Sequence, residues 1–148
     1  TGWCGGIRTE AARANSLVKD IHIAETNELR LKEMADLVEA KTATTDYRDI
    51  LKIKDIDAVI ISATPETTHF PMARDALLAG KHVFLEKPIA IELSEADELI
   101  NLAKKLYCKI LRVRFFTSLA TILYLLPIFF PFFSPSERSL AMYTNFRR

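Results

Sequence analysis

A glycine-rich turn opens the sequence, and its spacing suits the binding of phosphate groups. Gly2 and Gly5 are separated by Trp3 and Cys4, which is the spacing of the last two glycines in a G-x-G-x-x-G turn. In such a turn, glycine lets backbone amides approach a pyrophosphate, and the helix after it adds unpaired N–H groups and the positive end of its dipole. Glycines near a chain end are by themselves more often an ordinary turn, so the interpretation depends on the residues further along the chain.

An acidic residue lies at the distance that a dinucleotide site requires. Glu25 is 20 residues after Gly5 and ends the apolar run "IHIAE". A carboxylate there can accept hydrogen bonds from the hydroxyls of an adenosine ribose, and it would repel the 2′-phosphate of NADP. A solvated carboxylate at the end of a strand is the ordinary alternative. Together with the glycines, Glu25 favours a cofactor site with NAD preferred to NADP, although the nearby Arg30 softens that preference.

Two later loops carry side chains that could act on a substrate. The stretch "TPETTH" covers residues 64–69 and "EKP" covers residues 86–88, and each comes after an apolar run. Lys87 could donate a hydrogen bond to a substrate hydroxyl or carbonyl and stabilise negative charge that develops on that oxygen. Pairing with Glu86 explains the lysine equally well. His69 could contact cofactor or substrate, but a histidine that enters a helix is more often a cap or a surface residue.

Strand and helix patterns alternate between residues 5 and 106, and this alternation positions the loops. Apolar runs predict buried strands at residues 21–25, 57–62 and 82–86. Helical patterns lie between them, with Thr26 or Asn27 placed to cap one helix and Gly80 to close another. We therefore predict an α/β fold with a doubly wound parallel sheet, in which ligands bind at the carboxyl ends of the strands.

The composition changes abruptly near residue 106. Residues 1–105 carry 14 Lys and Arg against 18 Asp and Glu, whereas residues 106–148 carry 6 against 1. Residues 115–133 include no charged side chain and are long enough to span a bilayer. We interpret residues 107–148 as an atypical aromatic, basic and apolar tail that arises from out-of-frame or intron-derived translation. A membrane segment at residues 115–133 is the alternative.

Charge and cysteine content argue against several other functions. The net charge of +1 gives no reason to expect a nucleic-acid partner. Cys4 and Cys108 form neither a metal-binding pair nor a disulfide framework, so we expect no metal site and a reducing, cytoplasmic location. A membrane is not an expected partner in the preferred interpretation.

Four stretches of this sequence resemble the N-terminal domain of the Gfo/Idh/MocA oxidoreductases. They are "TGWCGGIR", "TTDYRDIL", "IDAVIISATPETTHFPMARDALLAGKHVFLEKPIA" and "SEADELINLAKK". The similarity runs from residue 1 to about residue 105, and the block "AGKHVFLEKP" is specific to the family. It implies a Rossmann-like NAD(P)-binding domain over residues 1–106. It also implies NAD(P)-dependent oxidation or reduction of a sugar, a cyclitol or a related polyol.

The resemblance assigns roles to residues at the matching positions. Lys87 is the candidate catalytic residue, since the family's lysine in this motif helps to position cofactor and substrate. The implied cofactor-binding residues are Gly2, Trp3, Cys4 and Gly5 at the pyrophosphate, Glu25 at the ribose, Thr64, Pro65 and His69 at the nicotinamide, and Glu86, Lys87 and Pro88 in the EKP motif. Glu66 departs from the family, which often has asparagine at that position.

The resemblance also implies parts that this sequence does not show. The family has a strand and a first glycine ahead of the position of Thr1, so we expect a sheet whose first strand is missing. It continues past residue 105 into a substrate domain with a catalytic histidine, but all three histidines here lie earlier. We therefore expect a fragment that is inactive alone, and a homo-oligomer that would form through the missing domain.

Two alternatives to a catalytic oxidoreductase stay open, and one other family is rejected. The chain could be a membrane-anchored dinucleotide-binding protein, or a dinucleotide-binding protein without catalysis. Short-chain dehydrogenases have a similar T-G-x-x-x-G-I turn, but they require tyrosine with a lysine four residues later. No tyrosine in this sequence has a lysine at that position, so we reject that family.

Overall fold

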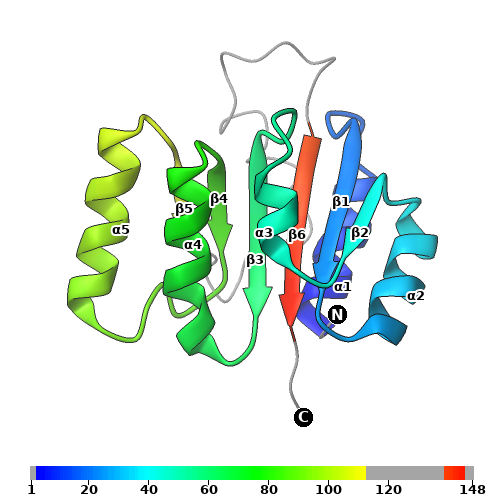
Figure 1. Cartoon of the computed structure of the whole chain (residues 1–148), viewed down its shortest axis with the longest axis horizontal. Coiled ribbons are helices and arrows are strands. Elements are labelled where there is room, and N and C mark those ends of the chain that lie inside the picture. The colour runs from blue at the N-terminus through cyan, green and yellow to red at the C-terminus, as the bar shows by residue number, and fades with distance from the viewer. Residues whose placement is uncertain (1–2, 113–138, 146–148) are drawn as a thin grey trace.

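The apolar runs form parallel strands of one sheet, as their continuous pattern predicts (Figure 1). The computed structural model describes residues 3–112 and 139–145. Within these residues the six strands are β1 (Asp20–Glu25), β2 (Thr42–Thr44), β3 (Ala58–Ala63), β4 (His82–Leu85), β5 (Ile110–Arg112) and β6 (Ser139–Asn145). All neighbouring strands pair in parallel. The prediction of an α/β fold with a parallel sheet is confirmed.

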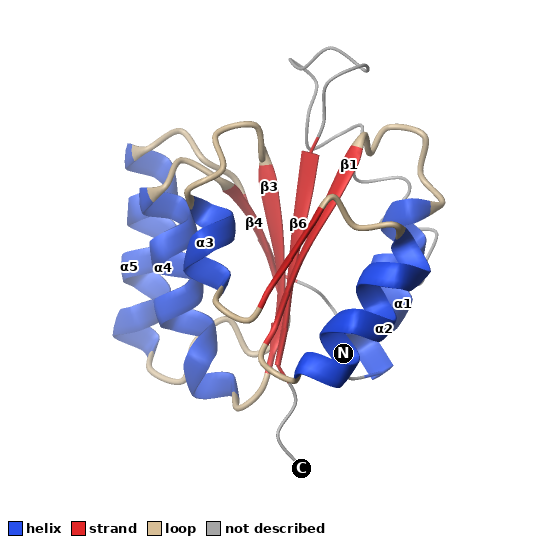
Figure 2. Ribbon diagram, turned by 45° about the vertical axis from the view of Figure 1, so that its right-hand side comes forward, coloured by secondary structure: helices blue, strands red, loops and turns tan. Residues whose placement is uncertain are grey.

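Helices cover both faces of the sheet. They are α1 (Trp3–Arg13), α2 (Glu28–Val38), α3 (Tyr47–Leu51), α4 (His69–Leu78) and α5 (Leu93–Lys105), with a short 3₁₀ helix η1 (Glu66–Thr68). Figure 2 shows α1 and α2 on one face and α3, α4 and α5 on the other. Each of the four connections from β1 to β5 crosses over through a helix, and helices on both faces make the sheet doubly wound.

The strand order places the end of the chain at the centre of the sheet. The order is β2-β1-β6-β3-β4-β5, and β6 pairs with β1 on one side and with β3 on the other. This is the Rossmann order with β6 in the place of its first strand. The inner edges of β1 and β3 carry N–H and C=O groups that need partners, and a strand between them supplies both.

Two strands of the sheet therefore come from residues 107–148, the range that the sequence predicts to be an atypical tail. These strands are β5 and β6. The suggested membrane segment, residues 115–133, lies outside the described residues. Among the described residues, no helix combines the length and the apolar character that crossing a bilayer requires.

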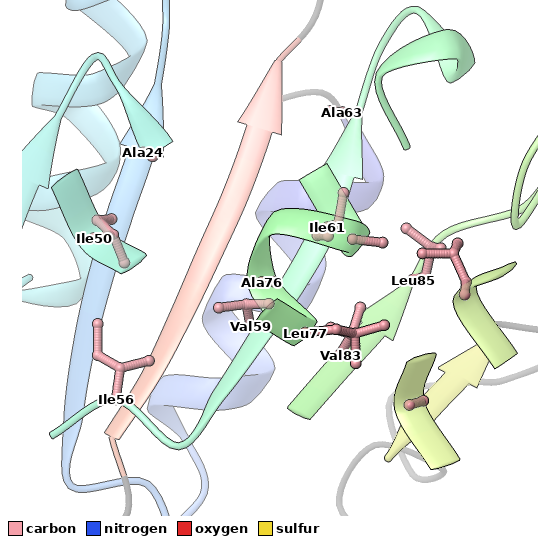
Figure 3. Packing of buried hydrophobic residues seen from close by; sticks show 13 residues of the cluster. Ala24, Ile50, Ile56, Val59, Ile61, Ala63, Ala76, Leu77, Val83 and Leu85 are labelled. Atoms are coloured by element: carbon pink, nitrogen blue, oxygen red, sulfur yellow. The ribbon is translucent and has the colours of Figure 1, made fainter. Parts of the chain in front are cut away.

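Alternating side chains of the strands build a core on each face. Val59, Ile61, Val83 and Leu85 are completely buried against the α3–α5 layer (Figure 3). Ile23 and the other residues of a second cluster pack against the α1–α2 side. Burying a side chain of this size contributes about 1.5–3 kcal/mol. Since β3 and β4 are packed on both faces, the loops that leave their carboxyl ends start from fixed points.

The entry into β4 is fixed by two neighbouring residues. Gly80 comes after α4 with φ +74°, the left-handed conformation that its place in the sequence predicts. Lys81 is buried, and its Nζ donates hydrogen bonds to the carbonyl oxygens of Ile53 at 2.8 Å and Lys54 at 3.2 Å. Burial lowers the pKa of Lys81. These contacts tie the start of β4 to the loop ahead of β3.

Candidate functional site

The predicted site residues collect at one edge because the strands run in the same direction. Glu25 ends β1, Thr64 comes directly after β3 and Glu86 directly after β4. Figure 1 shows the arrowheads of these strands pointing to the edge at which α1 also begins. Parallel sheets of this kind bind ligands at this edge, near the point where the strand order reverses. The site residues are thus placed where a ligand could contact several of them.

Helix α1 brings the glycine-rich turn to this edge. It begins at Trp3 and packs against β6, while Gly2 lies outside the described residues. Gly5 is buried in its first turns, and the Thr9 hydroxyl donates to the Gly5 carbonyl at 2.8 Å. The first N–H groups of an α-helix have no partner within the helix. The amides at the start of α1 therefore suit an anionic group at the centre of the edge.

Glu25 is held by the turn that it begins. Its side chain is 1% exposed, and Oε1 accepts hydrogen bonds from the Asn27 backbone N–H at 3.0 Å and the Thr26 hydroxyl at 3.5 Å. The Asn27 side chain in turn accepts from the Arg30 backbone N–H at 3.1 Å and caps α2. The carboxylate at the end of β1 is thus oriented by residues that come directly after it in the sequence.

Lys87 is presented without a charged partner. It is exposed, and in the described part of the chain its ammonium group makes neither a hydrogen bond nor an ion pair. The carboxylate of the preceding Glu86 instead accepts a hydrogen bond from Arg8 Nη2 at 2.8 Å. The alternative in which Lys87 pairs with Glu86 is therefore not what the structure shows. The loop after β4 offers a free cation to the edge of the sheet.

His69 joins the two loops rather than facing solvent. It is 1% exposed, with Nδ1 at 2.6 Å from the Pro88 carbonyl oxygen and Nε2 at 2.9 Å from the Ala63 carbonyl oxygen. Thr64 is half-buried and Pro65 is exposed, next to the end of β3. The bonds that precede Pro65 and Pro88 are both cis. His69 thus connects the end of β3 to the EKP motif from beneath the surface.

Sequence reasoning missed Arg8 and Ser62. Arg8 Nη1 lies 3.5 Å from the Ser62 hydroxyl, in addition to its contact with Glu86. One signal was present in the sequence: Ala11 and Ala12 lie three and four residues after Arg8 and are buried, so Arg8 lies on the inward stripe of α1. A charged residue on such a stripe indicates a buried partner.

The donor set at this edge fits a dinucleotide. The amides at the start of α1 suit phosphates, the Glu25 carboxylate suits ribose hydroxyls and the Lys87 ammonium suits a polar oxygen at the reactive end. Within residues 3–112 and 139–145, no group of His, Cys, Asp and Glu side chains has the arrangement of a metal site.

Comparisons with known proteins agree with this arrangement. A family model for the Gfo/Idh/MocA oxidoreductases, described as an oxidoreductase family with an NAD-binding Rossmann fold, matches residues 1–115. The uncharacterized oxidoreductase YrbE of Bacillus subtilis is 37% identical over 83 residues, which cover 56% of this chain and 24% of YrbE.

Two solved structures resemble this chain. GenD2 from gentamicin A biosynthesis, in complex with NAD, is 26% identical with a TM-score of 0.69 over 75% of this chain and 31% of GenD2. KijD10, a 3-ketoreductase from Actinomadura kijaniata in complex with TDP-benzene and NADP, is 27% identical with a TM-score of 0.65. That alignment covers 70% of this chain and 32% of KijD10. The chain thus spans about a third of the length of each of these two proteins and about a quarter of YrbE.

Proposed function

This chain belongs to the Gfo/Idh/MocA family of oxidoreductases with an NAD-binding Rossmann fold. From that premise we propose that the edge between Glu25 and Lys87 holds NAD, for the oxidation or reduction of a sugar, cyclitol or related polyol. One observation carries the proposal. Lys87 is an exposed cation without a partner among the described residues, at the same edge as Glu25 and the start of α1.

The adenosine side of the site is the turn after β1. Glu25 would accept hydrogen bonds from the ribose hydroxyls, because its carboxylate ends the strand next to the start of α1. The same negative charge would oppose the 2′-phosphate of NADP, so NAD is the preferred cofactor. The structures of GenD2 with NAD and KijD10 with NADP support a dinucleotide of this class.

The pyrophosphate would lie at the start of α1. Trp3, Cys4 and Gly5 supply backbone N–H groups there, and the helix dipole adds a positive partial charge. Gly5 is buried in the first turn of α1, where the fingerprint places a glycine so that the helix can pack closely on the sheet.

The reactive side is the pair of loops after β3 and β4. NAD supplies hydride acceptor or donor chemistry when it is bound. Lys87 would donate a hydrogen bond to the substrate oxygen and stabilise the negative charge that develops there, while Thr64, Pro65 and Pro88 shape the surface around it. His69 would hold these loops together through the carbonyl groups of Ala63 and Pro88.

A titration of the full chain with NADH and NADPH, monitored by fluorescence, tests this proposal. We expect Glu25→Ala to weaken NADH binding about tenfold, the loss of one or two ribose hydrogen bonds, and to weaken NADPH binding much less. The ratio of the two affinities is informative because a folding defect would lower both equally.

Glu28→Ala is the matched control. Glu28 has the same charge, lies three residues away in the first turn of α2 and is exposed. It should leave both affinities unchanged. An unchanged ratio in Glu25→Ala, or an equal change in Glu28→Ala, would show that the ribose does not lie at this turn.

A further inference from the structure

Arg8 is a charged residue on the buried side of α1. It is 9% exposed, and the residues one turn further along the same stripe, Ala11 and Ala12, are almost completely buried. Burying a guanidinium group is unfavourable unless its charge and its donors are matched. The partners of Arg8 must therefore offset that penalty, and they show which parts of the structure Arg8 connects.

The partners of Arg8 lie on two adjacent strands. Ile61 of β3 is opposite Leu85 of β4 in the register, so the next residues, Ser62 and Glu86, are neighbours on the face that α1 covers. Arg8 Nη2 is 2.8 Å from Glu86 Oε2 and Nη1 is 3.5 Å from Ser62 Oγ. Arg8 therefore reaches from the glycine-rich helix to the ends of both strands that carry the reactive loops.

The ion pair changes what Lys87 can do. Glu86 precedes Lys87 directly, and a carboxylate without another partner would attract the Lys87 ammonium. The Arg8–Glu86 pair is largely buried, with side chains 11% and 16% exposed, and the Glu86 backbone N–H donates to the Ile61 carbonyl at 2.9 Å. The Glu86 carboxylate is thus turned towards α1, and the exposed Lys87 is not paired with it.

We propose that Arg8 is a positioning residue: it binds the Glu86 carboxylate so that the Lys87 ammonium stays available to the ligand. The inference rests on the proposed function in one respect, namely that Lys87 binds the ligand. The pairing that makes Lys87 available is a property of the protein without ligand. It can therefore be tested without cofactor or substrate.

The rate at which Lys87 is acetylated by an amine-reactive reagent, monitored by mass spectrometry, measures its availability in the full chain without ligand. Arg8→Met should lower this rate about threefold, because an exposed ion pair of ordinary strength would occupy Lys87 for most of the time. The double variant Arg8→Met/Glu86→Gln should restore the rate, since the competing carboxylate is gone.

Two controls separate this role from a structural one. Lys52 is exposed and pairs with Asp49 at 2.7 Å, so its acetylation rate should be the same in every variant. Arg13→Met removes another arginine of α1, one that pairs with Glu39, and should leave the Lys87 rate unchanged. If Arg8→Met does not fold, Arg8→Gln carries the test, because it removes the charge and keeps hydrogen-bond donors on the buried face.

The outcomes for Arg8 and for the proposed function are distinguishable. A Lys87 rate that does not change in a folded Arg8 variant, or that the added Glu86→Gln does not restore, would overturn the positioning role. A lower rate that the double variant restores supports it. NADH affinity reports on the function separately: if Lys87→Met binds NADH as the unchanged chain does, the proposed use of Lys87 fails.

Discussion

A carboxylate lies at the end of β1 and another directly after β4, both at the same edge of the sheet, but different kinds of contact hold them. Glu25 accepts its backbone hydrogen bond from a residue two positions away in the sequence. Glu86 accepts from Arg8, which is 78 positions away, and the adjoining Pro88 contacts His69. The hydrogen bonds described for the Glu25 side chain come from its neighbours in the sequence, whereas those of the second region come from distant elements.

This difference predicts different responses to substitution. Asn27 in the turn after β1 is exposed and caps α2, so the loss of its side chain should affect mainly the start of that helix. The loops after β3 and β4 share buried partners from α1 and α4, so the loss of one partner affects both loops. Substitutions in the two regions should therefore differ in size, with the largest loss of stability at the buried partners of these loops.

His69→Leu should have the largest effect on stability. It removes the buried imidazole that contacts the carbonyl oxygens of Ala63 and Pro88, and puts an apolar side chain against these two acceptors. We expect the free energy of unfolding to fall by about 2–4 kcal/mol in a chemical denaturation experiment. Thr68→Ala, one residue earlier, removes only an exposed hydroxyl bond to Pro65 and should change it by less than about 0.5 kcal/mol. Equal effects of the two substitutions would contradict the long-range character of this region.

Asn27→Ala should be milder. It removes the side chain that caps α2 beside Glu25, and such caps contribute about 1 kcal/mol. Asn27→Ser keeps a capping oxygen and should change the free energy of unfolding by only a few tenths of a kcal/mol, within about 0.5. If Asn27→Ala destabilised the protein as much as His69→Leu, the turn after β1 would not be a local structure.

Acidification should destabilise both sides of the sheet slightly. Burial lowers the pKa of His22 in β1 and of His82 in β4, and the Lys109 charge lowers the pKa of His82 further. The unfolded chain therefore takes up protons at a higher pH than the folded chain, so stability that is present above pH 6.5 is lost as the pH falls.

We expect a loss of about 1 kcal/mol or less per histidine between pH 7 and pH 5, because nearby carboxylates offset part of the effect of burial on each pKa. Denaturation curves at several pH values for His22→Gln and His82→Gln should each show a weaker pH dependence than the unchanged chain. Protonation of His82 would also break a hydrogen bond, since its Nδ1 accepts from the Lys109 backbone N–H at 3.0 Å. Stability that rises on acidification would contradict the sign.

Lys87→Met should have the smallest effect on stability. The side chain is exposed and unpaired among the described residues, so the free energy of unfolding should change by less than about 0.5 kcal/mol. NADH affinity should fall nonetheless. Lys105→Met, an exposed lysine at the end of α5, should change neither. A large loss of stability in Lys87→Met would show that the lysine is structural.

The same contrast explains what the sequence could predict. Glu25, the cap at Asn27 and the positive φ of Gly80 depend on neighbouring residues, and sequence spacing indicated each of them. The contact of Arg8 with Glu86 and the burial of His69 depend on residues from other elements, so no local pattern identified their partners. The place of β6 was missed for a similar reason. It depends on the paired edges of β1 and β3 rather than on the residues of β6 itself.

The central claim is that one dinucleotide spans both regions. Backbone amide chemical shifts of the full chain, recorded during a titration with NAD, test it most directly. We predict that the shifts change together, with one affinity, at the start of α1, in the turn after Glu25 and at Lys87. Shifts that change at only one of these places, or that give different affinities, would contradict a single shared ligand.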